Sequence, residues 1–244
     1  MLRCAHVAAC LATLAAPAAA QTTPAPIRVD ASRLKGGEWR YRTTATSGGQ
    51  TRTLKRVLTV SPATLDGAAA WLIVDRQDAG MAKVADSLYL RRSDAAPLRH
   101  RLHAGQVSAA LDFGRDSVRG TMTLPEGSGP IAAPYPRGAM VTGTMLEMYL
   151  RLLPLAPGWT GELTMGAIGA NGAVAVPVSV AVAGEENVTV PAGTFPSFLL
   201  SIRAQGSEQR AWVTRDGREV VRISAELGPS ATATKVETVL ESRR

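Results

Sequence analysis

Cysteine is nearly absent from this sequence, and its two copies, Cys4 and Cys10, both lie at the start of the chain. A chain that loses its first residues on export has no disulfide, no thiol nucleophile and no cysteine ligand for a metal. An exported protein with a sufficient core needs no such covalent link. The residues after position 20 are numerous enough for one large all-β domain.

The first twenty residues have the order of a secretory signal peptide. A single arginine precedes an apolar run at residues 7–16, and Ala18-Ala19-Ala20 form a small-residue cleavage site. The alternative is that residues 7–10, Val-Ala-Ala-Cys, are a lipobox and Cys10 becomes a lipidated N-terminus. Because a lipobox leaves only nine residues for the export signal, we expect cleavage after Ala20 and a periplasmic or secreted protein.

Aromatic residues make up only 5% of the sequence. An outer-membrane barrel needs aromatic girdles, and single-stranded nucleic acid is bound by aromatic residues placed among basic ones. Long apolar runs are also lacking. The best candidate, residues 173–183, is shorter than the ~20 residues of a spanning helix, and its valines alternate as in a strand. We therefore expect no outer-membrane barrel, no spanning helix and no nucleic-acid partner.

Catalytic and metal-binding motifs are lacking too. After position 20 the sequence has two histidines, His100 and His103, and a strand points residues at this spacing to opposite sides. We expect a structural His100 and a solvated His103. Asp75 and Asp78 could form an acid/base pair, but an Asp-rich turn at a strand end is commoner. With no hydrolase, metalloprotease, phosphate-loop or calcium-loop motif, we expect no enzyme activity, no cofactor and no metal.

What the sequence does contain is short segments in which apolar and polar residues alternate. They recur roughly every 10 residues with Gly, Pro, Asp or Ser between them, which favours an antiparallel meander over βαβ units. The predicted strands are residues 38–45, 51–60, 71–76, 87–92, 98–103, 107–113, 118–124, 173–183, 188–190, 198–204, 210–215, 218–227 and 232–240, with strands resuming from residue 162. Residues 125–137, rich in Gly and Pro, interrupt the pattern.

The best-defined turn follows Val188 and Val190, which share one face of a strand. Pro191 cannot donate to a sheet ladder and Gly193 can take a positive φ, so the chain should reverse here. We expect Phe195 to fold back over this hairpin. A second hairpin is predicted around Asp216-Gly217.

One helix is predicted between Thr144 and Pro154. Thr144 and Glu147 have the spacing of a capping box, and Pro154 ends the helix. Only Glu147 and Arg151, an i,i+4 pair, interrupt its apolar surface. A helix that is apolar around most of its circumference should be buried on most sides, so we expect it to plug the concave face of a curled sheet.

Methionines gather on and around this helix. Their adaptable side chains could line an apolar ligand pocket, and the alternative is ordinary core packing. The candidate pocket residues are Met122, Met140, Met145, Met148, Tyr149, Leu152 and Met165.

Positive charge is concentrated in the first half of the chain. Residues 21–123 hold 16 Lys and Arg against 9 Asp and Glu, whereas residues 124–244 hold 10 against 11. Such a field would attract an anionic membrane surface or another polyanion. The alternative is that arginines decorate exposed strands and protect sheet edges.

Several motifs together resemble a bacterial periplasmic family of unknown function. They are Leu-Pro-Leu-Ala-Pro-Gly-Trp at residues 153–159, the valine-alternating strand, Val-Pro-Ala-Gly-Thr-Phe at 190–195, and the hairpin at 212–222. The resemblance covers residues 140–230. That family is similar in shape to the lipoprotein carriers and receptors of outer-membrane lipoprotein sorting. The resemblance implies an unclosed antiparallel half-barrel wrapped around a helix, and it brings no catalytic residues.

The sequence thus predicts a mostly β protein with a signal peptide at residues 1–20, a flexible lead-in at 21–35 and one half-barrel domain at 36–244. We expect a non-enzymatic envelope protein that binds a lipid or another amphiphile between sheet and helix. The alternative is a structural or interaction protein with a filled core and no small ligand.

Overall fold

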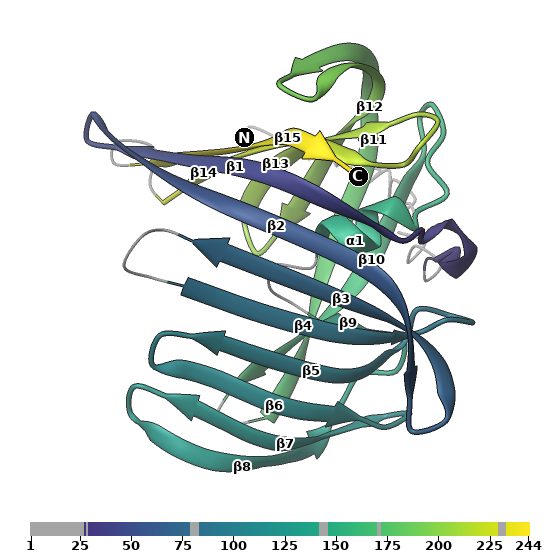
Figure 1. The fold of residues 1–244 in the computed structure, drawn as a ribbon, viewed down its shortest axis with the longest axis vertical. Coiled ribbons are helices and arrows are strands. Elements are labelled where there is room, and N and C mark those ends of the chain that lie inside the picture. The colour runs from purple at the N-terminus through teal and green to yellow at the C-terminus, as the bar shows by residue number, and fades with distance from the viewer. Residues whose placement is uncertain (1–26, 28, 79–82, 142–145, 170–171, 229–232) are drawn as a thin grey trace, which may run out of the picture.

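A computed structural model describes residues 27, 29–78, 83–141, 146–169, 172–228 and 233–244. In this part of the chain fifteen strands form one sheet, which curls into a half-barrel without closing (Figure 1). One short α-helix lies in its concave face. The mostly β, unclosed architecture predicted from the alternation of residues is confirmed.

The elements follow one another in chain order, from a 3-10 helix to the last strand. They are η1 (Ala31–Arg33), β1 (Gly37–Ser47), β2 (Gln50–Leu65), β3 (Ala68–Asp78), β4 (Lys83–Arg91), β5 (Pro97–Ala104), β6 (Val107–Phe113), β7 (Ser117–Leu124), β8 (Gly127–Pro134), β9 (Met140–Val141), α1 (Leu146–Arg151), β10 (Thr160–Gly169), β11 (Gly172–Val190), β12 (Gly193–Ala204), β13 (Ser207–Thr214), β14 (Val220–Leu227) and β15 (Thr234–Arg243).

The strand order shows how the two halves of the chain are joined. Strands β1 to β8 form one antiparallel meander, β10 to β15 form another, and the two meet where β1 pairs with β15. In this seam Tyr41 lies opposite Leu240. The two-residue β9 pairs in parallel with β10 at the far edge, which is the one exception to the antiparallel pairing among the described strands.

The half-barrel has two ends, which we call proximal and distal. The proximal end is where β1 begins and β15 ends, and the distal end carries the turns of the β1–β2, β5–β6 and β7–β8 hairpins, on the left of Figure 1. The lead-in closes against the proximal side of the helix, because Asp30 N donates to the carbonyl of Leu152. Ala31 and Leu34 are buried there. Part of the predicted lead-in is therefore packed against the core.

The structure corrects two local predictions. Residues 127–134, expected to interrupt the meander, form strand β8, because a strand at the sheet edge tolerates proline on its unpaired side. Among the described residues the helix spans Leu146–Arg151, so it ends three residues before Pro154. The hairpin predicted around Asp216-Gly217 is present between β13 and β14, and its residue with positive φ is Arg218, at 54°.

Two predictions concern parts of the chain outside the described residues. The signal peptide lies wholly within 1–26, and the capping residue Thr144 and Met145 lie within 142–145. Among the described residues, no helix has the length and apolar character needed to cross a membrane.

Candidate functional site

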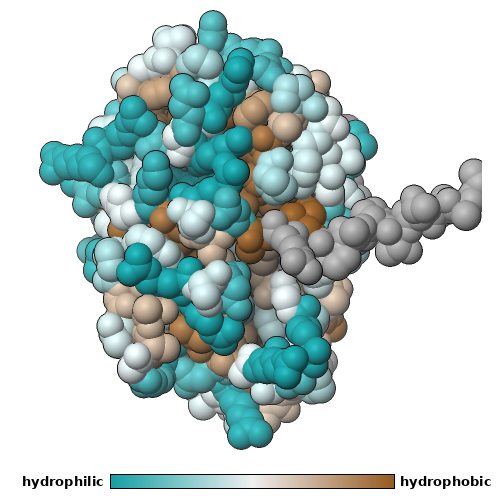
Figure 2. Space-filling model, turned by 90° about the vertical axis from the view of Figure 1, so that its right-hand side faces the viewer, coloured by the Kyte–Doolittle hydropathy of each residue, from teal (hydrophilic) through white to brown (hydrophobic). Residues whose placement is uncertain are grey.

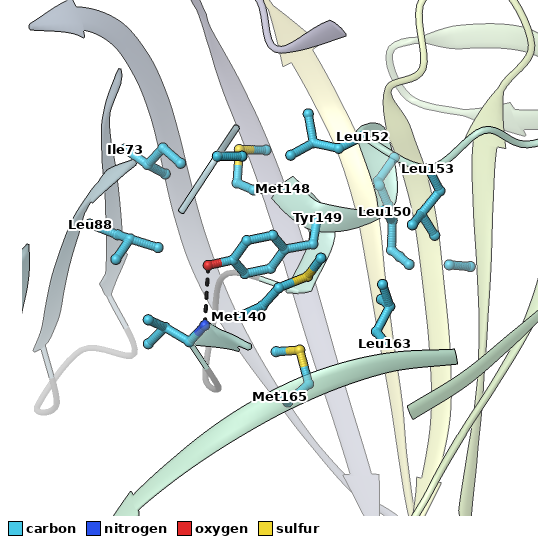
Figure 3. Packing of buried hydrophobic residues seen from close by; sticks show 14 of the residues in the cluster. Ile73, Leu88, Met140, Met148, Tyr149, Leu150, Leu152, Leu153, Leu163 and Met165 are labelled. Atoms are coloured by element: carbon cyan, nitrogen blue, oxygen red, sulfur yellow. Dashed lines mark hydrogen bonds between the residues drawn. The ribbon is translucent and has the colours of Figure 1, made fainter. Parts of the chain in front are cut away.

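The space around the helix is filled by its own side chains. Met148, Tyr149 and Leu152 have no exposed surface, and neither do Leu150 and Leu153. They pack against the sheet from inside (Figure 3), where the Tyr149 hydroxyl accepts a hydrogen bond of 3.2 Å from the Val141 backbone N–H. The helix therefore acts as the plug that its apolar circumference predicted.

The predicted pocket residues separate into two groups. Met140, Met148, Tyr149, Leu152 and Met165 are buried in one core cluster, four of them close together in Figure 3 around Tyr149. Met122 is half-buried on β7, beyond that core. The structure thus places most of the predicted pocket in the packed interior, and Met145 lies outside the described residues.

Apolar residues continue along the inner face beyond the core, toward the distal end. The pairing of β4 to β7 places Val84, Ala104, Val107 and Leu124 in one row, and all four are half-buried. The next row brings Leu102 beside Ala109 and Met122. Half-buried apolar side chains on an inner face are available to a molecule that enters the half-barrel from this end.

In the second half of the sheet, apolar side chains on the inner face are more exposed. Val174 on β11 and Leu227 on β14 are the two large hydrophobic side chains that are most exposed among the described residues, at 61% and 47%. Val174 lies an even number of residues from the buried Val176 and Val178, so it is on the same face of β11. Leu227 is likewise on the same face of β14 as Ile223, which pairs with the buried Ala211. Both therefore lie on the inner face, at the distal end.

Two apolar clefts open at the distal end. One, of about 470 Å³, lies along the β7–β8 hairpin and is lined by Met122, Leu124, Pro130 and Ile131. The other, of about 130 Å³, lies where the helix begins, between Leu146 and Met165 on one side and Ile202 on the other. The predicted residues Met122 and Met165 thus line clefts, but not the same one.

A network of buried charged groups joins the inner face of the sheet to the helix. The Arg56 Nε donates to both carboxylate oxygens of Asp75 at 2.9 Å, and its Nη atoms donate to Glu147 of the helix. Burial opposes the charge of Arg56, but Glu147 and Asp75 together raise its pKa above the ordinary value. Burial raises the pKa of Asp75, against the attraction of Arg56.

This network corrects two interpretations of the sequence. Asp75 lies within β3, fully buried, and not at a strand-end turn. Glu147 and Arg151 are also buried, at 7% and 4% exposure. Instead of pairing with each other, Glu147 binds Arg56, and Arg151 stacks at 3.9 Å over the ring of Trp39.

The two histidines lie as the sequence predicted. His100 is buried and its Nε2 lies 2.7 Å from Asp86, whereas His103 is exposed. Asp86 is opposite Asp75 in the β3–β4 pairing, so the His100 pair continues the buried polar chain across the sheet. Among the described residues, no group of three His, Cys, Asp or Glu side chains could hold a metal ion.

The turn after Val190 also has the predicted backbone. Gly193 has φ of +132°, a conformation that L side chains rarely adopt, and the ring of Phe195 lies 3.5 Å from where a Cβ of Gly193 would be. Phe195 is only half-buried, with Arg243 over its ring, while Pro191 is exposed. This site is a structural turn.

Most arginines of the basic first half have acidic partners. Arg40 pairs with Glu38, Arg91 with Asp94, and Arg99 and Arg101 both with Asp112. Arg42 reaches Glu241 on β15. These pairs place opposite charges beside these arginines, but the net positive excess of the first half remains, because most of these carboxylates are already in its charge count.

Comparison with solved structures finds a protein from Bacteroides fragilis NCTC 9343 that is described as exported and of YmcC-like fold. It has 15% sequence identity to this chain, with a TM-score of 0.33, and the match covers 90% of this chain and 100% of that one. No curated protein matches the sequence at a significant level.

The comparison with protein families is more direct. A family model described as "Protein of unknown function (DUF3108)" matches residues 28–235. The match begins far N-terminal of residues 140–230, the region whose motifs suggested a family of unknown function. The similarity to lipoprotein carriers stays a prediction. Because the match covers most of the chain and of its sheet, the protein belongs to the family of proteins of unknown function DUF3108.

Proposed function

We propose that this protein is an exported, non-enzymatic protein of the cell envelope that binds an apolar or amphiphilic molecule at the distal end of its half-barrel. The observation that carries the proposal is the position of Val174 and Leu227, exposed at 61% and 47% on the inner face. Large apolar side chains left exposed inside a concave surface are typical of a ligand-binding groove.

The packing of the core supports a ligand at the distal end rather than between the sheet and the helix, where the sequence predicted it. The side chains of Met148, Tyr149 and Leu152 already fill the space between sheet and helix, so a ligand would contact the distal lining and the clefts at Met122 and Met165. The clefts at Met122 and Met165 have apolar walls with few charged groups, which suits an acyl chain, whereas the hollow beside Leu227 also has charged residues, which suits a polar headgroup. The signal-peptide pattern of residues 1–20 supports export.

The test is a titration with the neutral fluorescent probe N-phenyl-1-naphthylamine, whose emission rises in apolar surroundings. The double variant Val174→Ser with Leu227→Ser should bind the probe several-fold more weakly than the parent. The matched control is Ala175→Ser with Glu226→Ser, which changes exposed neighbours on the opposite face of the same two strands. Equal binding by both double variants, or no binding by the parent, would refute the proposal.

The second candidate is a structural or interaction protein with no small ligand, and the filled core around Tyr149 favours it. In that case native mass spectrometry of protein purified from periplasmic extract should show the bare mass of the chain or of a protein complex. A co-purified mass of lipid size would support the ligand-binding proposal instead.

A further inference from the structure

The proximal end has a hollow of its own, of about 370 Å³, and its walls differ from the distal lining. Five of its lining residues are cationic: Arg33, Lys35, Arg151, Arg243 and Arg244. Glu219 is the one carboxylate residue among the lining side chains, and the ring of Trp39 forms an apolar wall. Figure 2 looks onto this end of the molecule, where much of the visible surface is hydrophilic.

Arg151 is the fixed member of this group. It is 4% exposed, its guanidinium stacks over Trp39, and its Nη2 donates to the Tyr41 hydroxyl at 3.2 Å. Its Nε is buried and has no hydrogen-bond partner. A buried charged donor without an acceptor is unfavourable, and such a group in a native protein calls for an explanation. Because Arg151 lines the hollow, an anion held there would lie beside this buried positive charge.

The carboxylates nearby do not balance the positive charge. Glu219 already accepts a 3.0 Å hydrogen bond from Trp39 Nε1 and pairs with Arg243. Arg33 pairs with Asp30 at 2.9 Å. Within the described part of the chain, no acidic side chain forms an ion pair with Lys35, Arg151 or Arg244. Burial and the nearby charge of Arg33 also lower the pKa of Arg218, so positive groups repel one another at this end.

We propose that this proximal hollow binds a phosphate group, either as free phosphate or as the headgroup of a phospholipid. A phosphate carries more than one negative charge and several acceptor oxygens, so it can satisfy Arg151 and two or three further cations at once. This proposal does not depend on the distal groove, because the two sites lie at opposite ends of the half-barrel and share no lining residue.

The test is calorimetric titration of the whole protein with inorganic phosphate and, separately, with soluble dihexanoyl phosphatidic acid. The double variant Lys35→Gln with Arg244→Gln removes two exposed charges from the hollow and should weaken binding on the order of tenfold. The control, Arg52→Gln with Lys55→Gln, removes two exposed charges at the distal part of β2 and should change the affinity less than twofold.

The outcomes separate the possibilities. Weaker binding in the hollow variant alone supports the site, and tighter binding of phosphatidate than of phosphate then identifies a lipid headgroup as the source, provided that the hollow variant also loses phosphatidate affinity. Equal affinities for the two probes identify free phosphate. Equal weakening in both double variants would show general attraction to positive charge and overturn the proposal, as would the absence of phosphate binding by the parent at millimolar concentration.

Discussion

Arg56 on β2 and Glu147 on α1 form a buried ion pair that ties the helix to the sheet across 91 residues of sequence. Both side chains are less than one-tenth exposed, and Asp75 holds the other side of the same guanidinium. Removing one partner of a buried pair leaves a charge without compensation, which is far more costly than losing an exposed pair.

We therefore expect Glu147→Gln to lower the free energy of unfolding by about 3 kcal/mol. Glu241→Gln is the matched control, because it breaks the exposed pair with Arg42 and should change that energy by less than about 1 kcal/mol. Urea denaturation of the two variants at pH 7 measures the difference. Similar effects of both substitutions would show that the buried pair does not hold the helix.

Tyr135 gives a prediction on pH. Its buried hydroxyl has no hydrogen-bond partner, and burial, followed by the neighbouring Tyr149, raises its pKa above the usual 10. Between pH 10 and the raised pKa the unfolded chain loses this proton and the native chain keeps it, so stability falls as pH rises. Tyr135→Phe should make that fall shallower.

At pH 7 the same substitution should leave the free energy of unfolding unchanged or raise it by up to about 1 kcal/mol, because it removes an unsatisfied polar group. Tyr149→Phe is the contrast, since it removes the acceptor of the buried Val141 N–H and should destabilise. Thermal melts from pH 7 to 11 test both. A destabilised Tyr135→Phe at pH 7 would reveal a hydrogen bond to that hydroxyl.

Gly166 on β10 tests the contact between this strand and Tyr135, which follows β8. A Cβ at Gly166 would lie 2.3 Å from the Tyr135 ring, whereas a Cβ at Gly169 on the same strand meets nothing within 4 Å. Gly166→Ala should therefore cost about 1–3 kcal/mol, and Gly169→Ala almost nothing. Equal melting temperatures for the two variants would contradict the close packing of Tyr135.

Gly193 tests the turn between β11 and β12. Valine at φ of +132° is strained whatever the surrounding space, so Gly193→Val should cost at least about 1–2 kcal/mol. Gly184→Val, in the partner strand β11 at an ordinary φ with no atom within 4 Å, is the control. Because Phe195 is only half-buried, Phe195→Ala should cost about 1–2 kcal/mol. A parent-like melting temperature for Gly193→Val would disprove the strain.

Local patterns predicted most of the sheet. Alternating residues identified most of the strands, because a residue's face in a strand depends only on its immediate neighbours. The same rule failed at β8, where Gly127, Gly129 and Pro130 weaken the pattern and pairing with β7 supplies the order instead. The buried side chains of the helix were also correctly expected, since its apolar surface is read within a few residues.

The candidate site was less accessible to such reasoning. Glu147 and Arg151 have the spacing of an i,i+4 pair, and nothing nearby in the sequence reveals that Arg56 and Trp39 bind them. The proximal hollow joins Lys35 to Arg244, from opposite ends of the described chain. The pairing of β1 with β15 brings such residues together, and no local pattern announces it.

The pairing of β1 with β15 also sets the order in which the sheet can be completed during folding. During synthesis the N-terminal meander emerges first, but its β1 edge has no partner until residues 234–243 arrive. Joining them closes a loop of nearly the whole chain, which is the kind of contact that slows folding. The first strand must therefore wait for the last, and until then its open edge is the surface on which a chaperone or a neighbouring chain would most easily add a strand.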